Sequence, residues 1–228
     1  MSDPSLNPWV IAAERVSRVL FRVETETTGG TAFAFMCAEN PSNDEYVTMF
    51  ATANHVVKDH NPGARLSLTS SDGTSILDAH SCTLTVIPPS TDEYDVALIS
   101  AISKRPTVAP NDLPPLLSHD FYPPRGAQLG WLGFPSIAWP ELCFFQGSLS
   151  GYPGAADAYL VDGVAINGVS GGPAFNDEGT IFGVVQAYIP NRPTIDLTLP
   201  GLMVVVPIGT LDRWIGRSMK TKPIPSAP

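Results

Sequence analysis

Charged side chains are scarce in this sequence. Asp, Glu, Lys and Arg make up 15% of its 228 residues, against about 25% in an average soluble domain. Acidic residues outnumber basic ones by 22 to 13, which gives a net charge of −9 at neutral pH. This net charge argues against a basic surface of the kind that holds nucleic acids or anionic membranes. We therefore expect neither of them among its partners.

Cysteine and long apolar runs are also rare. Cys37, Cys82 and Cys143 cannot all pair within one molecule, and none has the spacing of a zinc ligand cluster. No apolar run approaches the roughly 20 residues of a membrane-spanning helix. Prolines and charges interrupt the N-terminus, where a signal peptide needs an apolar stretch. We expect free thiols, no metal, no cofactor and a cytoplasmic protein.

Proline and glycine are abundant instead, with 23 and 19 residues. They separate short segments in which apolar and polar residues alternate, a pattern typical of a β-barrel or sandwich. A turn is expected at Gly29-Gly30. Strands are predicted at 19–24, 31–37, 46–53, 65–70, 75–87, 95–101, 127–133, 143–150, 158–161, 173–175, 180–188 and 202–206.

Two short helices are predicted near the ends of the chain. Asn7 is a favourable N-cap and Pro8 a favourable first helical residue, so a helix through about Arg15 fits. Apolar residues at helical spacing indicate a second helix over 208–217.

Three segments contain the residue types of acyl transfer. His55 ends an apolar strand, Asp95 leads into another, and Ser170 lies in a glycine-rich turn. A serine hydroxyl needs a base to become a nucleophile, and imidazole can be that base. A carboxylate can orient the imidazole, and glycines let backbone N–H groups converge on an oxyanion. Each feature alone is common in ordinary proteins, so the inference depends on their combination.

The order of these segments resembles trypsin-fold (chymotrypsin-like) serine proteases, closer to the bacterial HtrA-type catalytic domain than to the secreted digestive enzymes. Residues 52–55, TANH, are similar to the family's T-A-A-H. Residues 95–98, DVAL, are similar to D-[IL]-A-L, and residues 168–173, GVSGGP, to G-[DN]-S-G-G-P. The resemblance extends over roughly residues 18–217.

This resemblance implies a serine endopeptidase that acts on proteins or peptides. Ser170 would be the nucleophile, His55 the general base and acid, and Asp95 the orienting carboxylate. The amides of Gly168 and Ser170 would form the oxyanion hole. The implied fold is all-β, with two six-stranded antiparallel barrels and short terminal helices. His55 and Asp95 would come from the first barrel and Ser170 from the second.

The implied organisation has five parts. They are an N-terminal segment at 1–17, the first barrel at 18–110, a proline-rich crossover at 111–125, the second barrel with its C-terminal helix at 126–217, and a tail at 218–228. So little chain follows the helix that no PDZ domain is expected here. A regulatory partner or a fused sensor domain would be compatible with the sequence, which says nothing of the oligomeric state.

The primary specificity pocket is also placed by the resemblance. Its floor would be the residue six positions before the nucleophile, Val164. Its walls would come from Ala165, Gln186, Tyr188, Gly201 and Met203. No carboxylate among these residues could neutralise a buried Arg or Lys side chain. This predicts cleavage after small or medium apolar residues.

The sequence departs from the secreted enzymes before the nucleophile. Val169 stands where they have an acidic residue that receives the new N-terminal amine on activation. Activation by N-terminal cleavage is therefore not expected, and what holds the Ser170 turn is left open. Two alternatives follow: a catalytically silent or partner-activated scaffold of the same fold, and an esterase or self-processing enzyme.

Two other hydrolase classes fit less well. Residues 168–172 also satisfy the G-x-S-x-G of α/β-hydrolases, but those enzymes have the order Ser, acid, His, and all four histidines here precede Ser170. A subtilisin-type order needs an Asp before His55. Neither Asp3 nor Asp44 ends a convincing strand.

Overall fold

The structure is a computed structural model that describes residues 7–61, 63–89, 95–118, 121–152, 158–194, 197–209 and 211. For 187–194 and 197–201 it describes the backbone alone. The elements up to the middle of the chain are α1 (Pro8–Ser17), β1 (Leu20–Thr25), β2 (Gly29–Asn40), β3 (Glu45–Thr52), α2 (Asn54–Val57), β4 (Leu66–Ser70), β5 (Ile76–Leu77), β6 (Thr83–Ile87), β7 (Ala97–Ser103) and η1 (Pro110–Asp112). The later elements are β8 (Gln128–Gly133), η2 (Ser136–Ala138), β9 (Cys143–Gly151), β10 (Tyr159–Asp162), β11 (Pro173–Phe175), β12 (Ile181–Thr194) and β13 (Leu197–Pro207).

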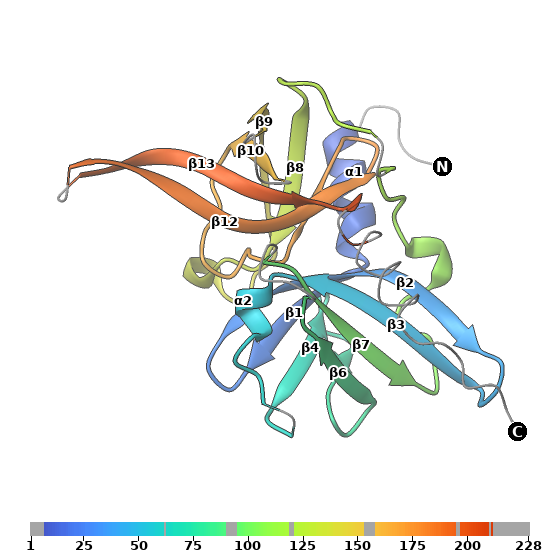
Figure 1. The fold of residues 1–228 in the computed structure, drawn as a ribbon. Coiled ribbons are helices and arrows are strands. Elements are labelled where there is room, and N and C mark those ends of the chain that lie inside the picture. Colours follow the sequence, from blue (N-terminus) through green and yellow to red (C-terminus); the bar gives the residue numbers. More distant parts are fainter. Residues whose placement is uncertain are drawn as a thin grey trace, which may run out of the picture.

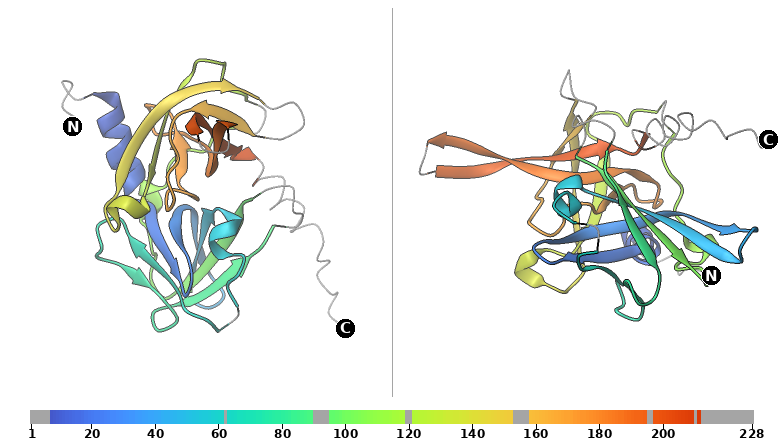
Figure 2. Two further views of the ribbon diagram at one scale, coloured as in Figure 1. Left: turned by 90° about the vertical axis from the view of Figure 1, so that its left-hand side faces the viewer. Right: turned by 60° about the horizontal axis from the view of Figure 1, so that its bottom comes forward.

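Two antiparallel sheets form the body of the molecule (Figure 1). The first has seven strands in the order β5-β4-β1-β2-β3-β7-β6, and the second is a closed barrel in the order β10-β13-β12-β11-β8-β9. In Figure 2 the second barrel lies over the first sheet, with α1 along the outside. The predicted all-β, two-barrel architecture is confirmed, with seven strands rather than six in the first sheet.

The seventh strand arises because the single strand predicted at 75–87 is divided into β5 and β6. The Asp78 carboxylate accepts hydrogen bonds from the backbone N–H groups of His80 at 3.0 Å and Ser81 at 3.1 Å. Such Asx turns reverse the chain locally. The turn separates a two-residue strand that pairs with β4 from a five-residue strand that pairs with β7.

The turn expected at Gly29-Gly30 lies earlier in the chain. The Thr25 hydroxyl accepts from the N–H of Thr28 at 3.0 Å, so threonines close the β1–β2 turn. Both glycines instead lie in β2, where they pair with β1. Close neighbours favour glycine at both positions: a Cβ on Gly30 would clash with Val56 at 2.7 Å, and one on Gly29 would lie 3.1 Å from the Trp139 ring.

The hairpin of β12 and β13 extends away from the body of the molecule (Figure 1). Its ladder continues to the pair Thr194↔Leu197, well past the strands predicted at 180–188 and 202–206. Prolines in this stretch predict earlier ends of the strands, but Pro190 falls at a register shift between Ile189 and Asn191. A strand tolerates proline, which has no N–H, at such an irregularity.

An apolar core joins the two sheets. Leu132, Phe175 and Val184 of the second barrel are buried in the same cluster as the first sheet, while a second cluster fills the barrel around Trp131. The N-terminal helix seals one side by burying Ala12 and Val16. As predicted, α1 starts after the Asn7 cap, whose side chain accepts from the N–H of Trp9. The helix predicted at 208–217 lies mostly outside the described residues.

Candidate active site

His55 lies on α2, the single helical turn that follows β3 (Figure 1). The neighbouring Val56 and Val57 are buried and hold this turn against the sheet. The His55 imidazole, by contrast, is 42% exposed. The ring is thus presented to solvent from a fixed backbone, as a proton-transfer group requires.

Asp95 lies two residues before β7 and contacts His55 twice. One carboxylate oxygen accepts from the His55 backbone N–H at 2.7 Å, and the other lies 2.5 Å from Nδ1. The Asp95 carbonyl also accepts from the N–H of Asn54 at 3.1 Å. An ionised carboxylate only accepts hydrogen bonds, so the neutral ring carries its proton on Nδ1. This leaves Nε2 with a free lone pair, the form needed by a general base.

Strand register explains why these two residues meet. β3 and β7 are antiparallel neighbours, and Thr52 pairs with Ala97 at the end of their ladder. The segment that leaves β3 and the one that enters β7 therefore lie side by side. His55 follows Thr52 by three residues and Asp95 precedes Ala97 by two, although the pair is separated by 40 residues in sequence.

Ser170 lies in a tight loop of the second barrel. Gly168 and Gly171 have φ angles of +94° and +88°, a region that glycine adopts without strain. Val169, between Gly168 and Ser170, is fully buried in the barrel core. Its N–H donates to Ile166 at 3.0 Å, so the loop is tied to the barrel at this residue.

The amides of this loop fall into two groups. Those of Val169, Gly171 and Gly172 donate to backbone carbonyls. Those of Gly168 and Ser170 donate to no acceptor in the part of the chain that the structure describes. Two unpaired N–H groups two residues apart are what an oxyanion-binding loop requires.

The loop docks on the first sheet beside α2. The backbone N–H of Thr31 donates to the Ser170 carbonyl at 2.9 Å. A Cβ on Gly171 would collide with the Thr31 carbonyl and lie 2.8 Å from the Ala53 nitrogen. The loop thus reaches the backbone just before α2. Within the described residues, the Ser170 hydroxyl itself makes no hydrogen bond to His55.

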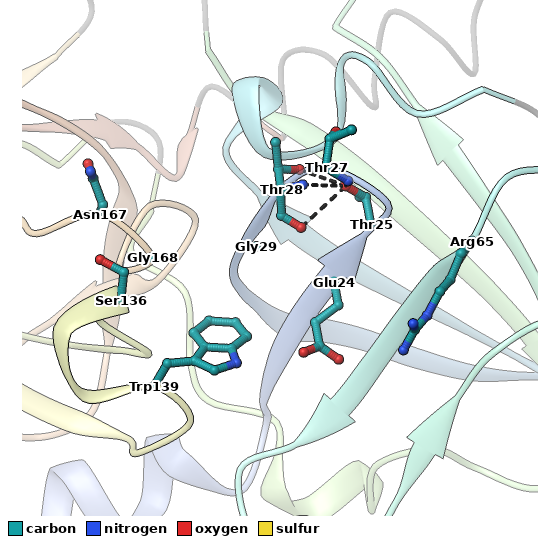
Figure 3. A pocket seen from close by; sticks show the side chains of 10 residues that line it. All are labelled: Glu24, Thr25, Thr27, Thr28, Gly29, Arg65, Ser136, Trp139, Asn167 and Gly168. Carbon is teal, nitrogen blue, oxygen red and sulfur yellow. Dashed lines mark hydrogen bonds between the residues drawn. The ribbon is translucent and has the colours of Figure 1, made fainter.

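A cavity of about 430 Å³ opens beside Gly168 (Figure 3). The β1–β2 turn and the η2 segment form its walls, with Trp139 and Glu24 directed toward the same space. The guanidinium of Arg22 stacks on Trp139, with its Cζ 5.2 Å from the ring centre. Its Nε lies 3.7 Å from a carboxylate oxygen of Glu24. The lining residues are Glu24, Thr25, Thr27, Thr28, Gly29, Arg65, Ser136, Trp139, Asn167 and Gly168.

None of the residues predicted to form the primary pocket lines this cavity. Val164 is 50% exposed, whereas Met203 is fully buried in the barrel core. Ala165 and Gln186 are half-buried, and the backbones of Tyr188 and Met203 pair across β12 and β13. Of Tyr188 and Gly201 the structure describes the backbone alone.

Sequence reasoning missed two contributors to this region, Thr31 and Trp139. In the sequence, Thr31 is one of several residues of a predicted strand, and Trp139 directly follows a short turn, so neither has a pattern of its own. Neither lies near His55, Asp95 or Ser170 in sequence, so no local pattern could associate them with the site.

The described residues offer no metal site and no membrane-spanning helix. No group of three or more His, Cys, Asp or Glu side chains is placed there to hold a metal ion. None of the helices described is long and apolar enough to cross a bilayer. All three cysteines are free and half-buried.

Sequence comparison identifies one family. The family described as the trypsin-like peptidase domain matches residues 30–184. This span contains the three residues singled out above, His55, Asp95 and Ser170. No curated protein sequence matches the chain.

Solved structures share the fold. One is a serine endoprotease from Yersinia pestis, with a TM-score of 0.70, 17% identity, and coverage of 96% of this chain and 69% of the other. Another is Rv3671c from M. tuberculosis H37Rv in an inactive serine-to-alanine form. Its TM-score is 0.61 at 19% identity, with coverage of 98% and 99%. At these identities the likeness shows the fold alone.

Substitution of Gly171 tests the docking of the loop. Gly171→Ala is expected to lower the free energy of unfolding by about 3 kcal/mol or more, because left-handed strain adds to the clash with Thr31. Gly63→Ala is the matched control, since Gly63 also has a φ of +88° but nothing within 4 Å of its Cβ position. It should cost only the strain, about 1–2 kcal/mol. Urea unfolding of both variants gives the values, and equal losses would contradict the close docking.

Proposed function

The chain belongs to the family of trypsin-like peptidase domains, and we propose that it is a serine endopeptidase that works through Ser170, His55 and Asp95. The observation that carries the proposal is the His55–Asp95 pair, 2.5 Å apart, on the sheet against which the Ser170 loop docks. Family membership makes proteins or peptides the substrate class.

The proposed reaction begins with attack by the Ser170 hydroxyl oxygen on the scissile carbonyl carbon. As the new C–O bond forms, the hydroxyl proton passes to His55 Nε2, and the carbonyl oxygen becomes an oxyanion. The Asp95 carboxylate stabilises the imidazolium through Nδ1. In the free enzyme such serine–histidine hydrogen bonds are often not yet formed, and they tighten when substrate binds.

The unpaired amides of Gly168 and Ser170 would receive the oxyanion. Collapse of the tetrahedral intermediate breaks the C–N bond, and His55 gives its proton to the departing amine. A water molecule then repeats the sequence on the acyl-enzyme, with His55 again as the base. This releases the acid and restores the Ser170 hydroxyl.

Active-site labelling is the test of the triad. A fluorophosphonate probe should add once to the wild-type protein, at Ser170, as read by intact mass and peptide mapping. Ser170→Ala and His55→Ala should abolish the adduct, because loss of either residue in a working triad costs on the order of 10⁶ in turnover. Asp95→Asn should lower kcat by about 10⁴-fold through the wrong imidazole tautomer.

His80→Ala is the control, since His80 is exposed and outside the site. It should label like the wild type. A folded wild-type protein that takes up no probe would contradict the proposal and favour the scaffold or partner-activated alternative. Labelling with ester turnover but no peptide cleavage would favour the esterase.

We also propose a preference for small or medium apolar residues before the scissile bond. Among the residues assigned to the primary pocket, Val164, Ala165 and Met203 are apolar and Gln186 is neutral. A buried Arg or Lys of the substrate would find no charge partner among them.

A peptide library varied at this position checks the preference. Cleavage after Ala, Val or Leu should exceed cleavage after Arg or Lys by about 100-fold or more, since an unpaired buried charge costs several kcal/mol. Dominant cleavage after Arg or Lys would overturn the assignment of the pocket and leave the triad untouched.

The 430 Å³ cavity is proposed to receive the leaving-group side of the substrate. It borders Gly168 but contains none of the residues assigned to the primary pocket. A substrate whose scissile carbonyl faces the Gly168 amide would place the residues before the scissile bond in the primary pocket and those after it in the cavity. Trp139 is the largest apolar surface among the lining residues.

Truncation of Trp139 tests this role. Trp139→Ala should raise KM about 10-fold for peptides that extend beyond the scissile bond, equivalent to about 1.4 kcal/mol of lost contact. It should leave unchanged the turnover of a coumarin amide that has no residues there. Ile137→Ala is the control, because Ile137 is 80% exposed on the same turn and does not line the cavity. An equal loss on both substrates would contradict the assignment.

A further inference from the structure

We propose that Thr31, a residue of the first sheet, is the positioning residue that holds the Ser170 loop of the second barrel in its oxyanion-binding form. The inference rests on the proposed function and extends it. The residue before Ser170 is Val169, a buried apolar side chain that cannot form an ion pair, so the loop must be held by other contacts.

Thr31 is completely buried on β2, and its side chain makes its hydrogen bonds to residues of the second barrel. Its hydroxyl donates to the Gly168 carbonyl at 2.8 Å and accepts from the Phe134 N–H at 3.1 Å. A hydroxyl has a single proton, which Thr31 donates to the Gly168 carbonyl. The donated and the accepted hydrogen bond together fix the orientation of this hydroxyl.

The backbone of Thr31 adds two further bonds. Its N–H donates to the Ser170 carbonyl at 2.9 Å, and its carbonyl accepts from the Thr52 hydroxyl at 2.7 Å. Thr52 is also fully buried and ends the strand that leads to His55. One residue thus connects the nucleophile loop to the base of the His55 turn.

The direction of the Gly168 amide follows from the peptide group to which it belongs. The carbonyl of that group, on Asn167, accepts from the Ser136 N–H at 2.7 Å. In a trans peptide the N–H points opposite to the carbonyl. The Gly168 N–H is therefore directed away from Ser136 while this bond is made.

The same reasoning applies to the Ser170 amide. Its peptide carbonyl, on Val169, accepts from the Gly172 N–H at 2.9 Å. The peptide between the two free amides has its carbonyl on Gly168, and that carbonyl is the one that Thr31 holds. This middle peptide shares a Cα atom with each flanking peptide, so the positions of both free amides depend on where it lies. Its N–H, on Val169, donates to the Ile166 carbonyl, and the Thr31 hydroxyl holds its carbonyl.

Removal of the hydroxyl alone tests the proposal. Thr31→Val keeps the shape of the side chain but leaves the Gly168 carbonyl and the Phe134 N–H unpaired. kcat should fall by about 10- to 100-fold, somewhat less than the loss of an oxyanion donor itself, with KM changed by less than about threefold. Thr31→Ser restores the hydroxyl and should recover most of kcat.

Thr48→Val is the matched control. Thr48 is equally buried, and its hydroxyl also donates once, to Cys37 Sγ, and accepts once, from the Thr107 hydroxyl. It lies on β3 outside the site, so the substitution costs similar buried bonds without touching the Ser170 loop. Its kcat should equal that of the wild type. An equal loss of kcat in Thr31→Val and Thr48→Val would mean that general destabilisation causes it, and would overturn the proposal.

Hydrogen exchange of residues 166–172 gives a readout that does not need activity. The amides of Val169 and Gly172 should exchange about 10-fold faster in Thr31→Val than in the wild type or in Thr48→Val. Faster exchange in Thr31→Val, combined with a wild-type protein that neither labels nor cleaves, would leave Thr31 as the support of the loop and contradict the proposed function. Unchanged exchange and unchanged kcat would overturn the role of Thr31 and leave the proposed function intact.

Discussion

The Ser170 loop and the first sheet approach each other until neither leaves room for a Cβ atom at the contact. A Cβ on Gly171 would collide with the Thr31 carbonyl, and a Cβ on Gly30 would lie 3.2 Å from the Ser170 carbonyl. Hydrogen bonds then lock the contact, with the Thr31 N–H on the Ser170 carbonyl and its hydroxyl on the Gly168 carbonyl. The separation between Ser170 and the His55 turn depends on this packing of backbone on backbone.

The other half of the site depends on strand register within the first sheet. Because β3 and β7 run antiparallel, the end of one and the start of the other share an edge, and His55 and Asp95 extend from that edge. A shift of one residue in this ladder would turn every side chain to the opposite face. The buried residues Phe50 and Ile99, paired in the same ladder, oppose such a shift.

Both sheets also contribute to the surroundings of the site. Trp139 comes from the second half of the chain, but the guanidinium that stacks on it belongs to Arg22 on β1. Arg22 is in turn close to Glu24 on the same strand. The cavity beside Gly168 is thus formed between the sheets, and its chemistry cannot be assigned to one barrel.

The sequence by itself determined the all-β class, most strands, the α1 cap at Asn7 and the three candidate residues. These are local features: alternation, a capping side chain, and short motifs in a given order. Other local predictions were wrong: Gly29 and Gly30 lie in a strand instead of a turn, and Pro190 lies within a long hairpin instead of beyond the end of a strand. Only the tertiary structure decided that those glycines face Trp139 and Val56, and that Thr31 holds a loop more than a hundred residues away. The physical reason is that a hydrogen bond or a steric contact depends on distance in space, and no pattern around Thr31 encodes which carbonyl its hydroxyl will meet.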